Sequence, residues 1–313
     1  MMRIISQLGP LAWLRRVLRT RLVASLTRRR NRETPMKIAC FPGDDIGDNV
    51  IAHGWYEDQL LKALFDALLV EHAASFARGT AIDVGANIGN HSLWFSRRFA
   101  RVLAFEPNPV CVKLLEANVL FNGLSNIRLF PIGLSDESAQ LEFHMDKGGN
   151  LGRSGVAHSL RDQTDAHFPV RVEAGDSVLT DEVLGEHPLR LLKLDIEGHE
   201  FRAIKGLAGI IARHAPIILF ESHGSGGEQG SDAIVALLSP LGYQHYYVIE
   251  RVRTPFRARF MRAAYRLARG ERWIARKVPR PGDRSYSLVV AAPRPLWLGA
   301  ASNGMPASRQ PEA

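Results

Sequence analysis

Short apolar runs alternate with amphipathic stretches along most of the chain, as they do when strands and helices take turns. Residues 81–84, 102–105, 189–194 and 216–220 are apolar nearly throughout, with Arg190 and Lys193 among the exceptions. Strands buried on both faces have this composition, so the pattern predicts an α/β fold with a mostly parallel sheet and helices on both faces. The last two predicted strands, 243–249 and 286–291, lack a full crossover between them, which favours one antiparallel member at an edge.

The segments between these runs have helical spacing or weaker strand patterns. Apolar positions three and four apart predict helices over residues 59–77, 109–122, 200–213 and 232–241. Residues 126–131, 141–145 and 170–173 are further strand candidates.

Two arginine-rich segments flank this pattern. Leu11, Leu14, Leu18 and Leu22 recur at three- and four-residue spacing within residues 1–34, and Phe256, Phe260 and Ile274 belong to a similar stripe within 254–277. We therefore divide the chain into a basic N-terminal helical extension over 1–34 and one domain over 35–293. The domain carries a basic amphipathic insertion at 254–277, and residues 294–313, rich in Pro, Ala and Ser, form a disordered tail.

Charge is distributed unevenly over these parts. Nine arginines and one acid give residues 1–34 a net charge of +8, and residues 250–284 reach +9, although the whole chain is only +8. The remaining domain is therefore acidic. Each basic segment can pack on the domain or lie on an anionic membrane surface. For the second segment, nucleic acid ranks below both because its aromatic residues are not interleaved with the arginines as a stacking platform requires.

Hydropathy and cysteine content indicate the compartment. No run of about 18 apolar residues is present, so a membrane-spanning helix is not expected. The two cysteines, Cys40 and Cys111, have no metal-ligand spacing and cannot form a disulfide framework. The sequence therefore predicts a cytoplasmic protein, with peripheral contact to the inner face of the cell membrane if the basic helices bind lipid.

The stretch from Asp83 to Glu106 carries the first candidate chemistry. Gly85 and Gly89 follow a predicted strand and permit a tight turn into a helix, where a ligand can approach the backbone. Asp83 would repel a pyrophosphate and suits a cationic ligand, whereas Glu106, at the end of the next strand, suits the two hydroxyls of a ribose. In the alternative interpretation Asp83 caps the helix and Glu106 is an exposed strand end.

Several ordered motifs resemble the FkbM family of S-adenosylmethionine-dependent methyltransferases: IDVGANIGNHS, AFEPNP, LKLDIEGHE and FES. The resemblance covers roughly residues 44–221. It implies a class I methyltransferase-like (Rossmann-like) fold, with a seven-stranded, mostly parallel sheet and one antiparallel strand. It also implies S-adenosyl-L-methionine as the cofactor.

The same resemblance assigns the cofactor site residue by residue. The methionine part would be held by Asp83, Gly85, Asn87 and Gly89. Glu106 would bind the ribose, with Pro107 and Asn108 shaping the pocket beside it. The turn from Ile132 to Ser135 would border the adenine. Tyr56 and Glu57 match an upstream family motif and would close over the cofactor or the acceptor.

A second acidic group follows the strand 189–194. In the family's strand order Asp195 and Glu197 would face the cofactor crevice, where a carboxylate can accept the proton of an acceptor hydroxyl or orient it. Glu221, at the next strand end, could assist. His199 replaces a residue that is usually small in the family, so it is either the base itself or a solvent-exposed residue in the first turn of a helix. No further ligand motif supports a metal ion at these acids, so none is predicted.

The sequence thus predicts an O-methyltransferase that modifies a hydroxyl of a sugar, glycan or glycolipid. Three alternatives stay open at this point. They are an NAD(P)-dependent oxidoreductase on a similar sheet, an RNA methyltransferase, and a non-catalytic membrane adaptor that retains the cofactor fold.

Overall fold

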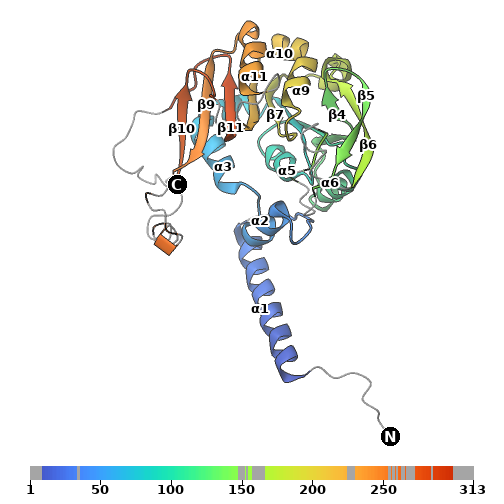
Figure 1. The fold of residues 1–313 in the computed structure, drawn as a ribbon, viewed down its shortest axis with the longest axis vertical. Helices are drawn as coiled ribbons and strands as arrows, with labels where there is room; N and C mark the ends of the chain where they lie inside the picture. The colour runs from blue at the N-terminus through green and yellow to red at the C-terminus, as the bar shows by residue number, and fades with distance from the viewer. Residues whose placement is uncertain are drawn as a thin grey trace.

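The computed structural model describes most of the chain. The described residues are 9–33, 36–146, 152, 154–156, 166–223, 230–252, 255, 258, 260, 261, 265, 272–282 and 285–298. Within them an eight-stranded sheet forms the centre of the molecule, and a three-stranded sheet lies beside it (Figure 1).

The main sheet has the strand order β10-β9-β11-β8-β7-β1-β2-β3. Five strands are mutually parallel: β1 (Thr80–Val84), β2 (Arg101–Phe105), β3 (Ile127–Phe130), β7 (Leu189–Leu194) and β8 (Ile217–His223). β11 (Ser285–Ala292) runs antiparallel between β8 and β9 (His245–Arg251). This arrangement confirms a mostly parallel, class I methyltransferase-like sheet. The expected seven strands with one antiparallel member at an edge are wrong: the described residues form eight strands, and β10 (Trp273–Val278) is a second antiparallel strand because it pairs with the outer edge of β9.

Alternate residues of the central strands enter different cores. Ile82 and Val84 of β1 pack under α9 (Glu200–Gly206), α10 (Ala208–His214) and α11 (Ser231–Leu238). Ala81 packs on the opposite face, which is covered by α3 (Asp58–Lys62), α5 (Asn90–Ser96) and α6 (Pro109–Phe121). Both faces are therefore buried, which explains why these strands are apolar nearly throughout. Asp83 shares the face of Ala81, since strand side chains alternate.

The predicted helix over 59–77 is divided in the structure. After α3 the chain forms a π-helical turn (Ala63–Leu68), a 3₁₀ turn (Val70–His72) and the short α4 (Ala73–Phe76). Leu64 and Leu69 are both fully buried, and the backbone N–H of Leu69 donates to the carbonyl of Leu64 at 2.8 Å. The wider π turn brings these two leucines onto the core face together. The predicted helix 200–213 is likewise interrupted, at the fully buried Leu207.

The second sheet has the order β4-β6-β5 and covers the outer side of the site. Its strands are β4 (Gly133–Ser135), β5 (Ala139–His144) and β6 (His167–Ala174), and the short helices α7 (Gly175–Val178) and α8 (Asp181–Leu184) lead back to the main sheet. Residues 133–135, predicted as part of a turn, form β4 instead, because β6 supplies a parallel partner strand.

The N-terminal extension forms α1 (Pro10–Glu33), which projects from the body and packs on α2 (Asp45–His53) (Figure 1). The helix predicted for residues 1–34 is confirmed over this range. Within the described parts of the chain, no helix combines the length and the hydrophobicity needed to cross a membrane.

The C-terminal part departs from the predicted boundaries. Trp273–Val278 form β10, antiparallel to β9, so the amphipathic helix predicted over 254–277 is wrong at its end; most of that segment lies outside the described residues. Leu296, placed by the sequence in a disordered tail, is 8% exposed, and its backbone N–H donates to Tyr247 Oη at 2.7 Å. An anchoring contact thus orders residues 294–298. The division into domains otherwise stays a prediction.

Candidate active site

The loop between β1 and α5 lies against the end of β7. Gly85 has a φ of +75°, and a Cβ atom there would lie 1.9 Å from the carbonyl oxygen of Asp195. Gly89 has a φ of +92°, and its Cβ would lie 2.2 Å from Cδ1 of Leu115. Glycine alone meets both demands, the left-handed backbone and the close approach. The two glycines therefore form the predicted tight turn, and Gly85 also brings that turn against Asp195.

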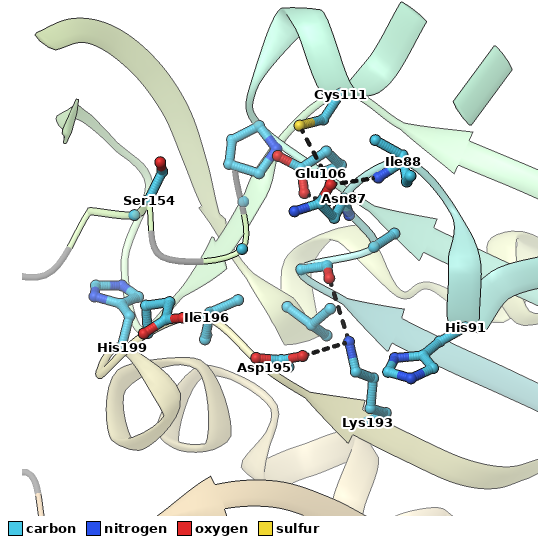
Figure 2. Close-up of a pocket in the computed structure, with 18 of the residues that line it drawn as sticks. Asn87, Ile88, His91, Glu106, Cys111, Ser154, Lys193, Asp195, Ile196 and His199 are labelled. Atoms are coloured by element: carbon cyan, nitrogen blue, oxygen red, sulfur yellow. Dashed lines mark hydrogen bonds and ion pairs between the residues drawn. The ribbon is translucent and has the colours of Figure 1, made fainter. Parts of the chain in front are cut away.

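Glu106 follows β2 and faces the same loop (Figure 2). Its Oε2 accepts a hydrogen bond from the backbone N–H of Asn87, and its Oε1 accepts one from the backbone N–H of Asn108, both at 2.8 Å. Burial raises the pKa of Glu106 to about 7, against the effect of these two hydrogen bonds. Each carboxylate oxygen has a second lone pair, so the group fits two ribose hydroxyls. At 5% exposure it is not an exposed strand end.

Asp83 does not face the pocket in the way the sequence suggested. Its side chain is fully buried beneath the loop, where Ser92 Oγ donates to its Oδ2 at 2.6 Å and Lys193 Nζ lies 3.0 Å from its Oδ1. The expectation of a direct contact between Asp83 and a cationic ligand is therefore wrong, because Lys193 already neutralises the carboxylate. The alternative of a helix cap does not hold either, since the carboxylate of Asp83 contacts the side chains of Ser92 and Lys193 and not a backbone N–H at the start of α5.

Lys193 is the site residue that sequence reasoning missed. It lies opposite Asp83 in the register of β7 and β1, and its Nζ also lies 3.3 Å from Asp195 Oδ2 and donates to the carbonyl of Gly85 at 3.2 Å (Figure 2). Burial lowers the pKa of Lys193, but Asp83 and Asp195 together raise it above the ordinary value. One ammonium group thus joins a buried acid, the glycine loop and the candidate catalytic acid. A lysine within an otherwise buried apolar strand was the available signal.

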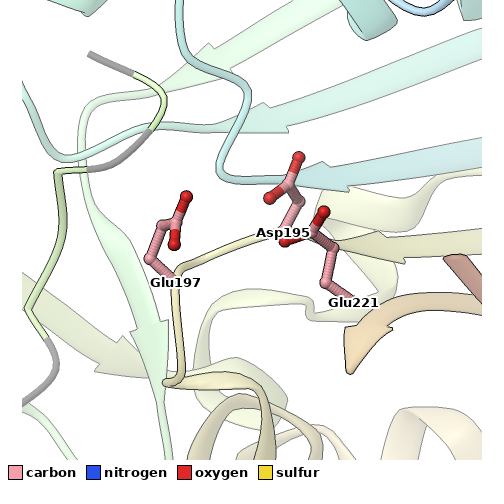
Figure 3. Close-up of side chains that lie close together, drawn as sticks. All are labelled: Asp195, Glu197 and Glu221. Atoms are coloured by element: carbon pink, nitrogen blue, oxygen red, sulfur yellow. The ribbon is translucent and has the colours of Figure 1, made fainter. Parts of the chain in front are cut away.

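Three carboxylates gather at the carboxyl ends of β7 and β8 (Figure 3). Asp195, Glu197 and Glu221 each offer an oxygen, and these oxygens lie within 4.8 Å of one another. Burial, followed by the charges of Asp195 and Glu197, raises the pKa of Glu221 to about 9. At neutral pH Glu221 therefore carries a proton. These three carboxylates could hold a cation, so the absence of a metal ion at this site stays a prediction.

The turn after Asp195 is fixed by Glu200. Glu197 has a φ of +53° and Gly198 a φ of +97°, so the chain reverses sharply here. Glu200 is buried, and its Oε1 accepts hydrogen bonds from the backbone N–H groups of Ile196 at 3.1 Å and Gly198 at 3.3 Å. Glu200 thus has a structural role at the start of α9, and it holds Glu197 toward the pocket.

His199 is neither the solvent-exposed residue nor the ready base that the sequence allowed. It is 6% exposed, and its Nε2 lies 3.0 Å from Ser135 Oγ. Burial, and then the nearby Arg202, lower the pKa of His199 to about 4. The imidazole is therefore neutral at neutral pH and too weakly basic to serve as the base expected of it.

Two predicted cofactor contacts act from behind the pocket wall. Asn108 is 1% exposed, and its Oδ1 accepts from the backbone N–H of Val110 as the cap of α6, so it shapes the site through Glu106. Ser135 is equally buried and faces His199. In the stretch expected to border the adenine, Gly133 and Leu134 line the pocket instead.

Tyr56 and Glu57 do reach the site, as the upstream motif predicted. Asn90 holds them by a reciprocal pair of 3.0 Å hydrogen bonds, from the Tyr56 N–H to Asn90 Oδ1 and from Asn90 Nδ2 to the Tyr56 carbonyl. Glu57 has a left-handed φ of +58° and lies 3.4 Å from His91 Nε2. Burial and the charge of Glu57 raise the pKa of Tyr56, so its phenol stays protonated. His91 thus positions Glu57, whereas His53 lines a groove outside this pocket.

One pocket brings these parts together. Its wall includes Tyr56, Glu57, Gly85, Asn87, His91, Glu106, Lys193, Asp195, Glu197, His199 and Glu221, together with Ile46, Leu134, Phe143 and Val172. An acid able to accept two hydroxyls, a glycine loop open to close approach and an apolar wall fit a nucleoside-containing cofactor.

Comparison with known proteins identifies the cofactor class. Residues 83–245, just over half of the chain, match the profile of the methyltransferase FkbM domain. The chain belongs to this family. The matched domain is therefore that of an S-adenosylmethionine-dependent methyltransferase, which contradicts the oxidoreductase alternative.

Curated relatives match over part of their length. The methyltransferase sdnD of Sordaria araneosa is 31% identical over 153 residues, covering 40% of this chain and 59% of sdnD. The hexuronic acid methyltransferase AglP of Haloferax volcanii is 29% identical over 144 residues, covering 45% of this chain and 54% of AglP. A crystal structure of an FkbM methyltransferase from Methylobacillus flagellatus has 21% identity and a TM-score of 0.37, covering 54% of this chain and 39% of that one, which is too low to carry an argument.

When bound, S-adenosylmethionine supplies an electrophilic methyl group attached to a positively charged sulfur. Of this chain's residues, Glu106 would accept hydrogen bonds from the ribose hydroxyls, and the loop of Gly85 and Asn87 would hold the methionine part. Leu134 and Phe143 offer an apolar wall for the adenine.

Proposed function

We propose that this methyltransferase modifies a hydroxyl group of a sugar in a glycan or glycolipid. The observation that carries the proposal is Asp195, whose carboxylate follows β7 directly beside the cofactor loop and is held by Lys193. Methylation of an alcohol oxygen requires the loss of its proton, and a carboxylate within hydrogen-bond reach can accept that proton.

The neighbouring acids take different roles in this proposal. Asp195 accepts the proton or aligns the hydroxyl, because the lysine fixes its orientation. Glu221, protonated at neutral pH, donates a hydrogen bond to Asp195 or to an acceptor oxygen. Glu197 extends the acidic wall, and His199 orients the pocket through Ser135 without taking up the proton.

A sugar is the acceptor class with the most support. Among the relatives, AglP is a hexuronic acid methyltransferase, and it aligns with 45% of this chain. Sugar hydroxyls also suit a site whose polar groups are carboxylates and a phenol, since such groups pair with hydroxyl donors and acceptors.

A direct assay tests the proposal. The full-length protein is incubated with S-adenosylmethionine and either hexuronic-acid-containing or neutral oligosaccharides, and the products are measured by mass spectrometry. We expect a methyl ether on a sugar. Asp195→Asn, with Arg78→Gln as a surface control, should abolish that product without changing cofactor binding. Methylation of RNA alone, or full activity of Asp195→Asn, would contradict the proposal.

We further infer that α1 holds the enzyme at the cytoplasmic, anionic face of a membrane, near a lipid-linked acceptor. Leu11, Leu14, Leu18 and Leu22 are 46% to 73% exposed and lie on one stripe of the helix. Arg16, Arg19 and Arg21 lie off that stripe, and Arg15 intrudes on it, so their stems can lie on lipid while their charges reach phosphate groups.

Flotation with vesicles tests this inference. Vesicles of phosphatidylserine and phosphatidylcholine should carry the protein at low salt, whereas vesicles of phosphatidylcholine alone should not. Leu14→Ser with Leu18→Ser should release it, and Leu120→Ser, at another exposed leucine, should not. Binding that persists without residues 1–34 would overturn the role of α1. If Leu14→Ser with Leu18→Ser leaves vesicle binding unchanged but alters the oligomeric state, the leucine stripe of α1 is a contact between copies of the chain.

A further inference from the structure

A second hollow adjoins the active site on the side of α3, α5 and β10. It is a groove of about 1180 Å³, and Tyr56 and Glu57 line both this groove and the cofactor pocket. A smaller recess between them is lined by Glu57, Leu60, Asp195 and Glu221. A molecule seated in the groove can therefore extend past Glu57 to the candidate catalytic acid.

The groove is too large for a single small group. Its volume exceeds the roughly 300–1,000 Å³ of sites that bind drug-sized ligands. Apart from Tyr56 and Glu57 the groove shares no lining residue with the cofactor pocket, so the groove is available to the acceptor. An acceptor built of several linked units could place one unit at Asp195 and the others in the groove.

Tryptophans form the base of this groove. Trp55 and Trp94 are each 4% exposed and meet edge to face with their ring centres 5.3 Å apart. The guanidinium of Arg98 lies 4.3 Å from the centre of the Trp94 ring and is paired with Asp66 at 3.2 Å. Trp273, from β10, is half-buried at the edge. The two buried rings make the base rigid, and the partly exposed Trp273 offers an aromatic face of the kind that packs against the C–H-rich faces of sugar rings.

The rim of the groove carries an available positive charge. Lys62 is paired with Asp58 at 2.7 Å, and Arg98 with Asp66, so these two cations are neutralised locally. Arg97 is exposed on the same rim, and among the described residues it has no acidic partner. A guanidinium in this position can pair with a carboxylate or phosphate through two parallel hydrogen bonds.

We propose that this groove binds the non-reacting part of the acceptor, an oligosaccharide with an anionic group that pairs with Arg97. The inference rests on the proposed function, because it takes the acceptor to be a sugar chain. Trp273 contacts a sugar face, Arg97 fixes the register of the chain, and Glu57 marks the passage to Asp195.

Binding measurements separate this inference from the proposed function. Trigalacturonate and maltotriose are titrated into the full-length protein with S-adenosylhomocysteine present, by calorimetry and by tryptophan fluorescence. We expect trigalacturonate to bind and maltotriose to bind at least tenfold more weakly. Arg97→Gln should weaken trigalacturonate about ten- to a hundredfold, since hydrogen bonds to a charged group are lost. Arg78→Gln, an exposed arginine away from the groove, should bind as the wild type does. Trp273→Phe should reduce the fluorescence change.

Each outcome decides the inference. Equal binding of the two saccharides, no binding of either, or unchanged affinity in Arg97→Gln would overturn it. If sugars are still methylated in any of these cases, the proposed function stands without the groove. Arg97-dependent binding of trigalacturonate without methylation of any sugar would support the groove as a saccharide site and contradict the proposed function. A phosphorylated maltose that binds as well as trigalacturonate would show that either anion satisfies Arg97.

Discussion

Lys193→Met tests how much the buried ion pairs contribute. The substitution keeps most of the side-chain volume but removes the cation 3.0 Å from Asp83 and 3.3 Å from Asp195. Asp83 is fully buried, and it would keep only the 2.6 Å hydrogen bond from Ser92. Removing one partner of a buried pair costs about 3–5 kcal/mol of unfolding free energy, a large share of the ~5–15 kcal/mol typical of a folded domain.

Urea unfolding followed by circular dichroism measures this loss, and binding of S-adenosylhomocysteine is measured beside it. The matched control is Arg190→Met, the same change on the same strand at an exposed position, where we expect a shift within about 0.5 kcal/mol. The double variant Asp83→Asn with Lys193→Met should be more stable than Lys193→Met alone, because no unpaired charge stays buried. A loss below about 1 kcal/mol in Lys193→Met, or a double variant no more stable than the single one, would refute the reasoning.

Three further predictions concern the pocket. The affinity for S-adenosylhomocysteine, measured by calorimetry, should fall as the pH drops through about 7, because protonation removes the Glu106 carboxylate that accepts hydrogen bonds from the ribose hydroxyls. Glu106→Gln should bind S-adenosylhomocysteine about ten- to a hundredfold more weakly, and its affinity should not depend on pH in this range. Methylation rate should fall as the pH rises toward about 9, because Glu221 then loses the proton that it donates to Asp195 or to the acceptor oxygen. Glu221→Gln, which keeps a donor at every pH, should flatten that fall in a pH–rate profile. Gly85→Ala should lower stability and cofactor affinity more than Gly242→Ala, which has a φ of +91° but no atom within 4 Å of the added carbon.

Contrary outcomes would be informative for each. A pH-independent affinity in the wild type would remove Glu106 from ribose binding. A pH–rate profile unchanged by Glu221→Gln would assign the titration to another group. Equal effects of the two alanine variants would mean that backbone conformation alone, and not the contact with Asp195, requires glycine at position 85.

Metal removal is a separate test of the carboxylate group. We expect activity to survive dialysis against EDTA, because Lys193 already supplies a positive charge beside Asp195. Activity that is lost on dialysis and restored by Mg²⁺ would show that Asp195, Glu197 and Glu221 hold a cation.

The strands and the glycine loop could be predicted because their causes are local. A continuous apolar run such as 189–194 is typical of a strand covered on both faces, and β7 has these same bounds. Gly85 and Gly89 indicated a left-handed turn by residue type alone. The placement of the acids at the ends of β7 and β8 beside the cofactor crevice followed from the strand order that the family resemblance implies.

The contacts across the sheet could not be predicted in the same way. The role of Asp83 depends on the register of β1 and β7, which places Lys193 opposite it. Strand register cannot be read from the residues of one strand alone. His199, at the start of α9, is buried against Ser135, which lies 64 residues earlier in β4 of the second sheet. β10 was mistaken for helix because its arginines and apolar residues also fit a helical stripe, and pairing with β9 decided the conformation.

The most direct test of the account is mass spectrometry of glycans from cells that carry the gene, lack it, or carry Asp195→Asn. The account predicts a methylated sugar in the first cells and the same sugar without the methyl group in the other two. Identical glycans in all three, with the protein present and able to bind S-adenosylhomocysteine, would contradict the assignment of a sugar hydroxyl as acceptor.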